Sequence, residues 1–71
     1  MKSDYRQTIE RTPDGWRILG DPETYPTLQE AWDEARQDLL QVGGGRIEVV
    51  DTRGRVRARH TVLVQDLGHA R

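Results

Sequence analysis

The chain has 71 residues with no cysteine, 34% apolar and 32% charged residues, and a net charge of −1 from 11 basic and 12 acidic side chains. This length suits one small domain, and the lack of cysteine excludes disulfides, thiolate nucleophiles and cysteine-ligated zinc. All apolar runs are short, so we expect neither a membrane span nor a signal-peptide core. The composition therefore predicts a cytoplasmic single domain over residues 1–71, with an ordered core over about 4–64.

The N-terminal part of the chain predicts a β-hairpin. Residues 4–11 alternate moderately between polar and apolar side chains and include the strand formers Tyr5 and Ile9. Pro13 and Gly15 then occupy the second and fourth positions of a type I turn, and residues 16–19 form the second strand. Residues 20–26 contain two prolines and predict a connection without regular structure.

A helix follows, starting after Thr27. Thr27 and Glu30 have the spacing of a capping box, in which each side chain satisfies an amide at the start of the helix. Apolar residues then recur at three- and four-residue spacing, which gives one apolar stripe, and Gly43 stands where a left-handed residue ends a helix. The stripe comprises Leu28, Ala31, Trp32, Ala35, Leu39 and Val42.

A second hairpin is predicted after the helix. Residues 46–50 form its first strand, and 51–54 form a type I turn closed by a glycine bulge. Residues 55–64 alternate cleanly, which predicts a long strand with its arginines on one face and its valines on the other. We expect residues 65–71 to form a flexible tail.

These elements predict an α+β fold of the order β-β-α-β-β, with a single antiparallel four-stranded sheet and one helix packed on one face. Replacing either tryptophan by alanine is expected to cost about 3–5 kcal/mol, because an indole is the largest side chain available to this core. The predicted core comprises Ile9, Trp16, Ile18, Leu28, Ala31, Trp32, Ala35, Leu39, Val42, Ile47, Val49, Val56, Ala58 and Val62.

Four local patterns give the chain a family resemblance. They are Gly15-Trp16-x-Ile18, the segment from Pro26-Thr27 to Ala35, Gly44-Gly45-x-Ile47-x-Val49 and Gly54-x-Val56. In this order they resemble the small bacterial family of domains of unknown function numbered 2188, over roughly residues 5–62. The resemblance implies a β-β-α-β-β domain of uncharacterised role. The arginine-rich last strand and the longer tail depart from the family pattern.

The sequence offers no arrangement typical of catalysis or of a cofactor site. His60 and His69 are the only histidines, and strand geometry turns His60 away from the hydroxyl of Thr61. Two histidines nine residues apart do not form a metal site. The glycines at 43–45 follow a helix, whereas phosphate loops precede one. We therefore expect no enzymatic activity, metal or cofactor, and we interpret His60 as a half-buried residue of an edge strand.

Charge is the feature that points to a surface. Residues 46–60 hold five arginines and two acids, a net charge of +3, whereas residues 27–42 hold four acids and one arginine, a net charge of −3. The fold puts the helix on one side of the sheet, so the other side becomes the candidate binding face. Its predicted members are Arg17, Arg55, Arg57, Arg59 and Leu63.

Three interpretations of this face remain open. A mixed arginine and aliphatic surface suits a protein partner or self-association, which favours a small non-enzymatic binding or assembly module. The arginine-lined strand at 55–59 also suits nucleic acid or phosphate, although the predicted face has no aromatic residue for base stacking and the isoelectric point is about 6.1. Arginine on a strand can also serve only to keep a sheet surface solvated.

Overall fold

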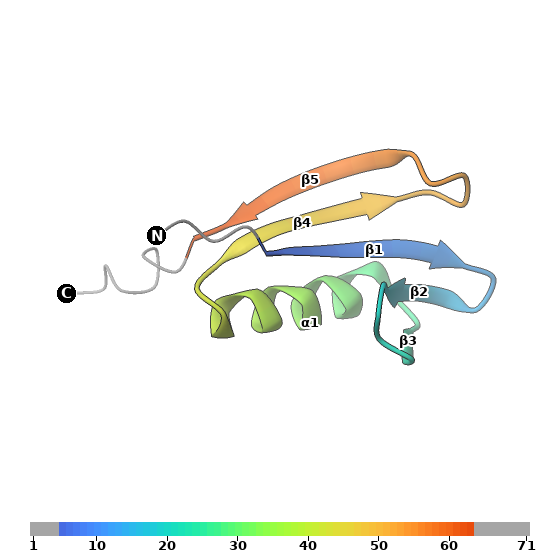
Figure 1. The fold of residues 1–71 in the computed structure, drawn as a ribbon. Helices are drawn as coiled ribbons and strands as arrows, with labels where there is room; N and C mark the ends of the chain where they lie inside the picture. The colour runs from blue at the N-terminus through green and yellow to red at the C-terminus, as the bar shows by residue number, and fades with distance from the viewer. Residues whose placement is uncertain (1–4, 64–71) are drawn as a thin grey trace.

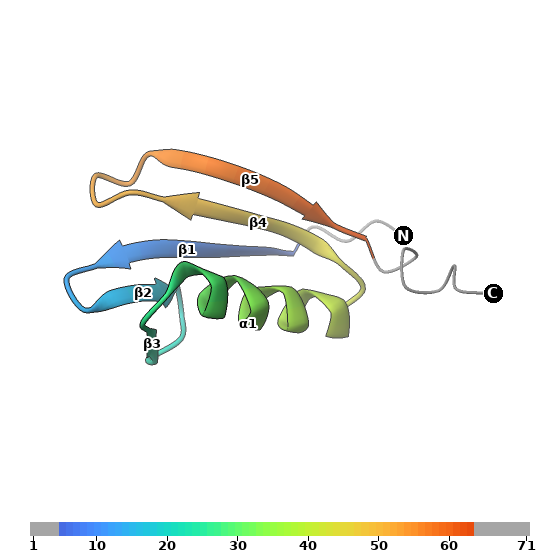
Figure 2. The same cartoon turned by 180° about the vertical axis from the view of Figure 1, so that it is seen from behind.

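A computed structural model describes residues 5–63 and shows one helix packed on one face of a single sheet (Figures 1 and 2). The strand order is β3-β2-β1-β4-β5. No helix in this part of the chain is long and apolar enough to cross a membrane. The elements are β1 (Arg6–Thr12), β2 (Gly15–Ile18), β3 (Thr24–Tyr25), α1 (Leu28–Gln41), β4 (Gly45–Val50) and β5 (Val56–Val62).

The predicted α+β class is confirmed, but the predicted antiparallel four-stranded sheet is wrong. The sheet is mixed and has five strands, because β1 pairs with β4 in parallel from Arg6↔Arg46 to Glu10↔Val50. The remaining neighbours pair antiparallel. Helix α1 returns the chain to the end of the sheet where β1 starts, so β4 runs in the same direction as β1.

The strand that the sequence did not predict is β3. Its two residues pair with β2 through Trp16↔Tyr25 and Arg17↔Thr24, within a segment that we expected to be irregular. Gly15 allows this close pairing, since a Cβ atom there would lie 2.3 Å from the carbonyl oxygen of Tyr25. A two-residue strand lies below the length that propensity patterns reveal, and its stability comes from the β2 partner.

Both helix ends follow the prediction closely. The Thr27 hydroxyl oxygen accepts a hydrogen bond from the Glu30 amide at 3.2 Å, although the Glu30 carboxylate accepts from that same hydroxyl instead of from a backbone amide. At the other end, the amide of Gly44 donates to Leu39 and that of Gly43 donates to Leu40. Gly43 has a φ of 98°, the left-handed conformation that ends many helices.

The second hairpin has the predicted turn and an unpredicted bulge. Asp51 accepts from the Gly54 amide, and Gly54 has a φ of 82°, as a type I turn with a glycine bulge requires. Within the strands, Val49 pairs with Ala58 but Val50 pairs with Val56, so Arg57 is an extra residue in β5. The bulge breaks the clean alternation that we predicted for residues 55–64.

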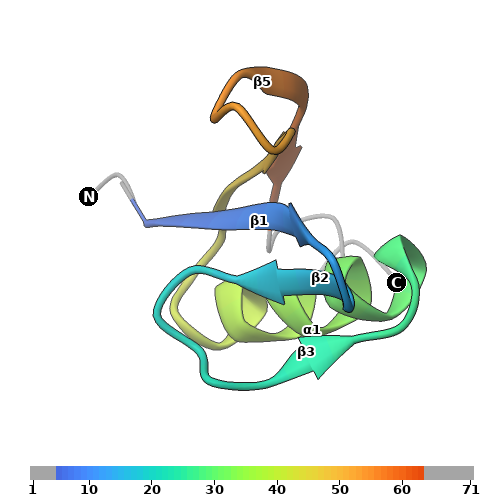
Figure 3. The ribbon, with the colours of Figure 1, turned by 90° about the vertical axis from the view of Figure 1, so that its right-hand side faces the viewer.

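The core is smaller than the sequence predicts. Ile9, Ile18, Leu39 and Ile47 are the largest fully buried side chains, and Trp16, Leu28 and Trp32 pack against the core while remaining half-buried. The predictions for Val42, Val56 and Ala58 are wrong, since all three are exposed. Val42 caps the helix beyond its buried stripe, and the other two belong to β5, an edge strand that extends beyond α1 (Figure 3). The predicted tail at 65–71 lies outside the described residues.

Candidate binding surface

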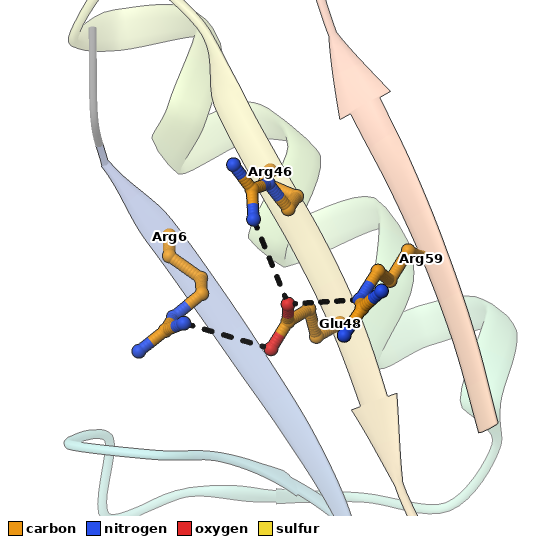
Figure 4. A network of polar contacts seen from close by, with 4 residues as sticks. All are labelled: Arg6, Arg46, Glu48 and Arg59. Atoms are coloured by element: carbon orange, nitrogen blue, oxygen red, sulfur yellow. Dashed lines mark hydrogen bonds and ion pairs between the residues drawn. The ribbon is translucent and has the colours of Figure 1, made fainter. Parts of the chain in front are cut away.

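A buried carboxylate organises the sheet face opposite α1, which we call the open face. Glu48 lies in the middle of β4 and is only 7% exposed, because β1 and β5 flank it on both sides. The Arg59 Nε atom donates to Glu48 Oε2 at 3.2 Å. Arg6 and Arg46 place their Nη1 atoms 3.8 and 3.9 Å from the same carboxylate (Figure 4). We call these four residues the Glu48 cluster.

The Glu48 cluster carries a net charge of +2, and its cations face solvent. The side chains of Arg6, Arg46 and Arg59 are 58%, 56% and 65% exposed, whereas that of Glu48 is 9% exposed. A guanidinium is a planar donor of five N–H groups and can bind a second carboxylate or phosphate while it contacts the first. The cluster can therefore recognise an anion from outside the chain.

The structure separates the predicted site residues into different environments. Arg17 forms an ion pair with Glu10 on β1, and Arg59 forms one with Glu48. Three strand spacings, about 14 Å, separate β2 from β5, so Arg17 is not adjacent to the other predicted residues. Leu63 follows β5 and is 45% exposed. The five residues therefore do not form one continuous patch.

Arg55 and Arg57 lie at the turn end of β5. The Arg55 amide donates to Asp51 Oδ1, and Arg57 is the extra residue of the bulge. Hydrogen bonds from the Arg55 and Arg53 amides, with the nearby charge of Arg57, lower the pKa of Asp51 below its usual value. Because the bulge interrupts strand parity, the shared face that we predicted for Arg55, Arg57 and Arg59 does not follow from the alternation.

Sequence reasoning missed three of the four residues in the Glu48 cluster. Glu48 alternates with the core residues Ile47 and Val49, and this parity could have placed it on the open face opposite the arginines. The same alternation could have placed Arg46 on the open face beside Glu48. Arg6 could not have been found, because its position depends on the parallel pairing of β1 with β4.

The second feature of this surface is the outer edge of β5, which we call the free edge. Within residues 5–63, β4 is the only strand that pairs with β5, and six of the seven β5 residues are exposed. A shallow depression lies here, lined by Val56, Arg57, Ala58 and Arg59. Figure 3 shows β5 extending beyond helix α1, and the rings of Trp32 on α1 and His60 on β5 contact each other.

The histidine in the described part of the chain has a packing contact. His60 lies opposite Ile47 on the helix side of the sheet, and its ring centroid is 5.5 Å from that of Trp32. It is exposed, so the predicted half-burial is wrong. Residues 5–63 hold no group of three or more His, Asp or Glu side chains placed to bind a metal ion.

Comparisons with known proteins give this surface no parallel. No protein-family model matches the chain, and neither a curated protein nor a solved structure shows significant similarity to it. The resemblance to the family of domains of unknown function therefore stays a prediction.

Proposed function

We propose that this protein is a small binding module that docks a protein partner on the open face and the free edge of β5. The observation that carries the proposal is the incomplete cover of the sheet within residues 5–63. Helix α1 lies on one face only, and six of the seven residues of β5 are exposed. A strand this exposed usually has a binding role or a device that prevents pairing.

The side chains on this surface suit recognition. Arginine is enriched at protein interfaces, and Arg6, Arg46 and Arg59 present more than half of their side chains to solvent. Val56 and Leu63 add apolar surface, at 41% and 45% exposure. A guanidinium offers five N–H donors in one plane, which suits the recognition of a carboxylate or phosphate of a partner.

A capture experiment with matched variants tests the proposal. Wild-type protein, the Arg55→Ala/Arg57→Ala/Arg59→Ala variant and a helix-side control, Arg36→Ala, are each used as bait in a nuclease-treated lysate, after circular dichroism confirms that each is folded. We expect a protein that is captured by wild type and by the control and is lost with the triple variant. Equal capture by all three baits contradicts the proposal.

The partner can be another protein or a second copy of this chain. Sedimentation velocity of the purified chain over a range of concentrations separates these cases. A dimer that the triple variant abolishes identifies a second copy. A monomer at all concentrations directs the search to a different protein.

Nucleic acid is the second candidate partner. It is favoured by the net charge of +3 over residues 46–60. The absence of aromatic side chains on the open face counts against it, because bases of a single strand stack on such side chains. The positions that alternate with core residues on β1, β4 and β5 hold none. Oligonucleotide binding at about 50 mM salt that weakens steeply as salt rises, by about one unit of log-log slope per arginine contact, would favour this candidate. No binding at that salt concentration excludes it.

A further inference from the structure

The two edges of the sheet differ in how well they are protected. At one edge, β3 has only two residues and Pro26 follows it, so little backbone is open to pairing. At the other edge, β5 has seven residues. From Ala58 to Val62 it pairs with β4 one residue for one, which leaves five residues of regular strand beyond the bulge. Alternate amide and carbonyl groups of such a strand point outward, away from β4.

The side chains along this regular segment differ between the two faces. Ala58, His60 and Val62 lie opposite Val49, Ile47 and Gly45 on the helix side, beside the half-buried Trp32. Arg59 and Thr61 lie opposite Glu48 and Arg46 on the open face. A strand added to β5 would therefore meet Ala58 and the His60 ring, which packs against Trp32, on the helix side and the Arg59 guanidinium on the open face.

We propose that the free edge of β5 accepts an extended segment of alternating acidic and apolar residues, which adds a sixth strand to the sheet. This inference rests on the proposed function and names the chemistry of its partner. Backbone hydrogen bonds to β5 supply affinity in this mode of recognition, and the alternating side chains supply specificity. Carboxylates of the partner meet Arg59 and the rest of the Glu48 cluster. Apolar side chains of the partner lie beside Ala58 and His60, the two exposed residues on the helix side of this segment.

Charge argues against a second copy of β5 as the occupant. Residues directly opposite in an antiparallel pair lie on the same face. A symmetric β5–β5 pair over the regular segment therefore places Arg59 opposite Arg59 when it is centred on residue 59, and diagonal to itself when it is centred on residue 60. Like charges at such positions are destabilising. The arginines therefore disfavour self-pairing and favour an acidic strand.

The helix restricts the pattern of the acidic segment further. Its exposed face carries the acids Glu30, Asp33 and Glu34, and the net charge over residues 27–42 is −3. Carboxylates on the helix side of an added strand would lie on the same side of the sheet as this negative charge, whereas carboxylates on the open face would meet arginine. Alternation of acidic and apolar residues, as opposed to acidity alone, is therefore the recognised feature.

Fluorescence anisotropy with defined peptides tests the alternation. The probe is a labelled peptide of eight residues with alternating glutamate and valine, titrated with the full chain at about 50 mM salt. Two controls have the same length: one has the same composition with the four glutamates contiguous, and one has lysine in place of glutamate. We expect binding of the alternating acidic peptide at least about tenfold tighter than of either control. Equal binding of the contiguous peptide overturns the proposal.

Backbone methylation of the peptide tests strand addition without changing the protein. Two isomers of the alternating peptide are methylated at the amides of either the glutamates or the valines, so that each isomer blocks one edge of the added strand. Because one edge faces β5 and the other faces solvent, we expect one isomer to keep its affinity and the other to lose about tenfold or more. An equal effect of the two isomers overturns strand addition.

A change of charge on the protein locates the site. Arg46→Ala/Thr61→Glu removes one positive charge from the open face beside the regular segment of β5 and adds a negative one, while it keeps the contact between Arg59 and Glu48; Arg36→Glu on α1 serves as the control. We expect the double variant to bind the acidic peptide about tenfold more weakly and the lysine peptide more tightly, and the control to match wild type. Unchanged binding by the double variant overturns the assignment to β5.

The outcomes separate this inference from the proposed function. Failure of the peptide tests, together with a captured protein that the triple variant loses, overturns strand addition and leaves the binding module standing. Failure of both overturns both. A dimer of the chain joined through β5, or an oligonucleotide that binds where the acidic peptide does not, also overturns the acidic strand as the occupant.

Discussion

Arg59 lies directly opposite Glu48 across the β4–β5 ladder, and its Nε atom donates to Glu48 Oε2 at 3.2 Å. The same carboxylate has Arg6 and Arg46 within 4 Å. One buried acid thus holds three exposed cations on the open face. The charge that this face shows to a partner depends on Glu48 as much as on the arginines.

Glu48→Gln is expected to lower the free energy of unfolding by about 1.5–3 kcal/mol, since hydrogen bonds to charged groups contribute about this much. The cost stays below the 3–5 kcal/mol typical of a broken buried pair, because the arginines left behind are exposed and regain water. Urea denaturation measures it. The control is Glu10→Gln, which breaks the more exposed pair with Arg17 and should cost less than about 1 kcal/mol. Equal costs would contradict the special position of Glu48.

Two residues of the predicted helix stripe should differ in their effect on stability. Leu39 is fully buried and Val42 is 44% exposed. Leu39→Ala should therefore cost about 2–5 kcal/mol, whereas Val42→Ala should cost less than about 0.5 kcal/mol. Thermal unfolding of the two variants beside wild type provides the measurement. Similar losses would show that Val42 packs against the core.

Alanine substitutions at two glycines with positive φ should distinguish the cost of backbone strain from the cost of steric overlap. A Cβ at Gly15 would meet the Tyr25 carbonyl oxygen at 2.3 Å, whereas a Cβ at Gly20 would meet nothing within 4 Å. Gly20→Ala should cost about 1–2 kcal/mol from its φ of 91° alone. Gly15→Ala adds an overlap of about 1–3 kcal/mol and displaces β3 from β2. Chemical denaturation measures the loss in free energy of unfolding for each variant. An equal loss would show that β3 can move away from β2 without an energetic cost.

The half-buried Tyr25 predicts a loss of stability at alkaline pH. Burial, followed by the charges of Asp21, Glu34 and Glu23, raises the pKa of Tyr25 from 10.0 to about 12. A raised native pKa stabilises the fold below pH 10, and this contribution disappears as the pH rises through about 12. Tyr25→Phe removes the dependence. Thermal melts between pH 9 and 12 should therefore fall more steeply for wild type than for the variant; parallel curves would contradict the assignment.

Asp51 predicts the opposite dependence in acid. Its pKa lies below the usual 3.8, chiefly because the amides of Arg55 and Arg53 donate to its carboxylate. A lowered native pKa stabilises the fold above pH 3.8 and is lost as the pH falls through the native value. We expect Asp51→Asn to be less stable than wild type at pH 6 and to approach it at pH 2. A difference in stability that stays constant between pH 6 and pH 2 would show that the charge of Asp51 does not stabilise the turn.

Local physical chemistry explains what the sequence alone could determine. Helix capping, a three- and four-residue apolar period and glycines at turns act within a few residues, so α1 and both hairpin turns were predicted within one or two residues. The same reasoning missed β3, because a two-residue strand exists only through its neighbour. It also missed the bulge at Arg57, which exists only relative to the register of β4.

The sequence determined which residues are charged and which segments form the helix and the two hairpins, because those properties depend on short-range interactions. Only the tertiary structure decided that β1 and β4 run parallel, that Arg6 reaches Glu48, and that β5 extends past the helix. These features depend on pairing between segments about 40 residues apart, which no local pattern encodes. The near-neutral charge of the chain conceals a positive sheet face only because folding places the acidic helix on the opposite side.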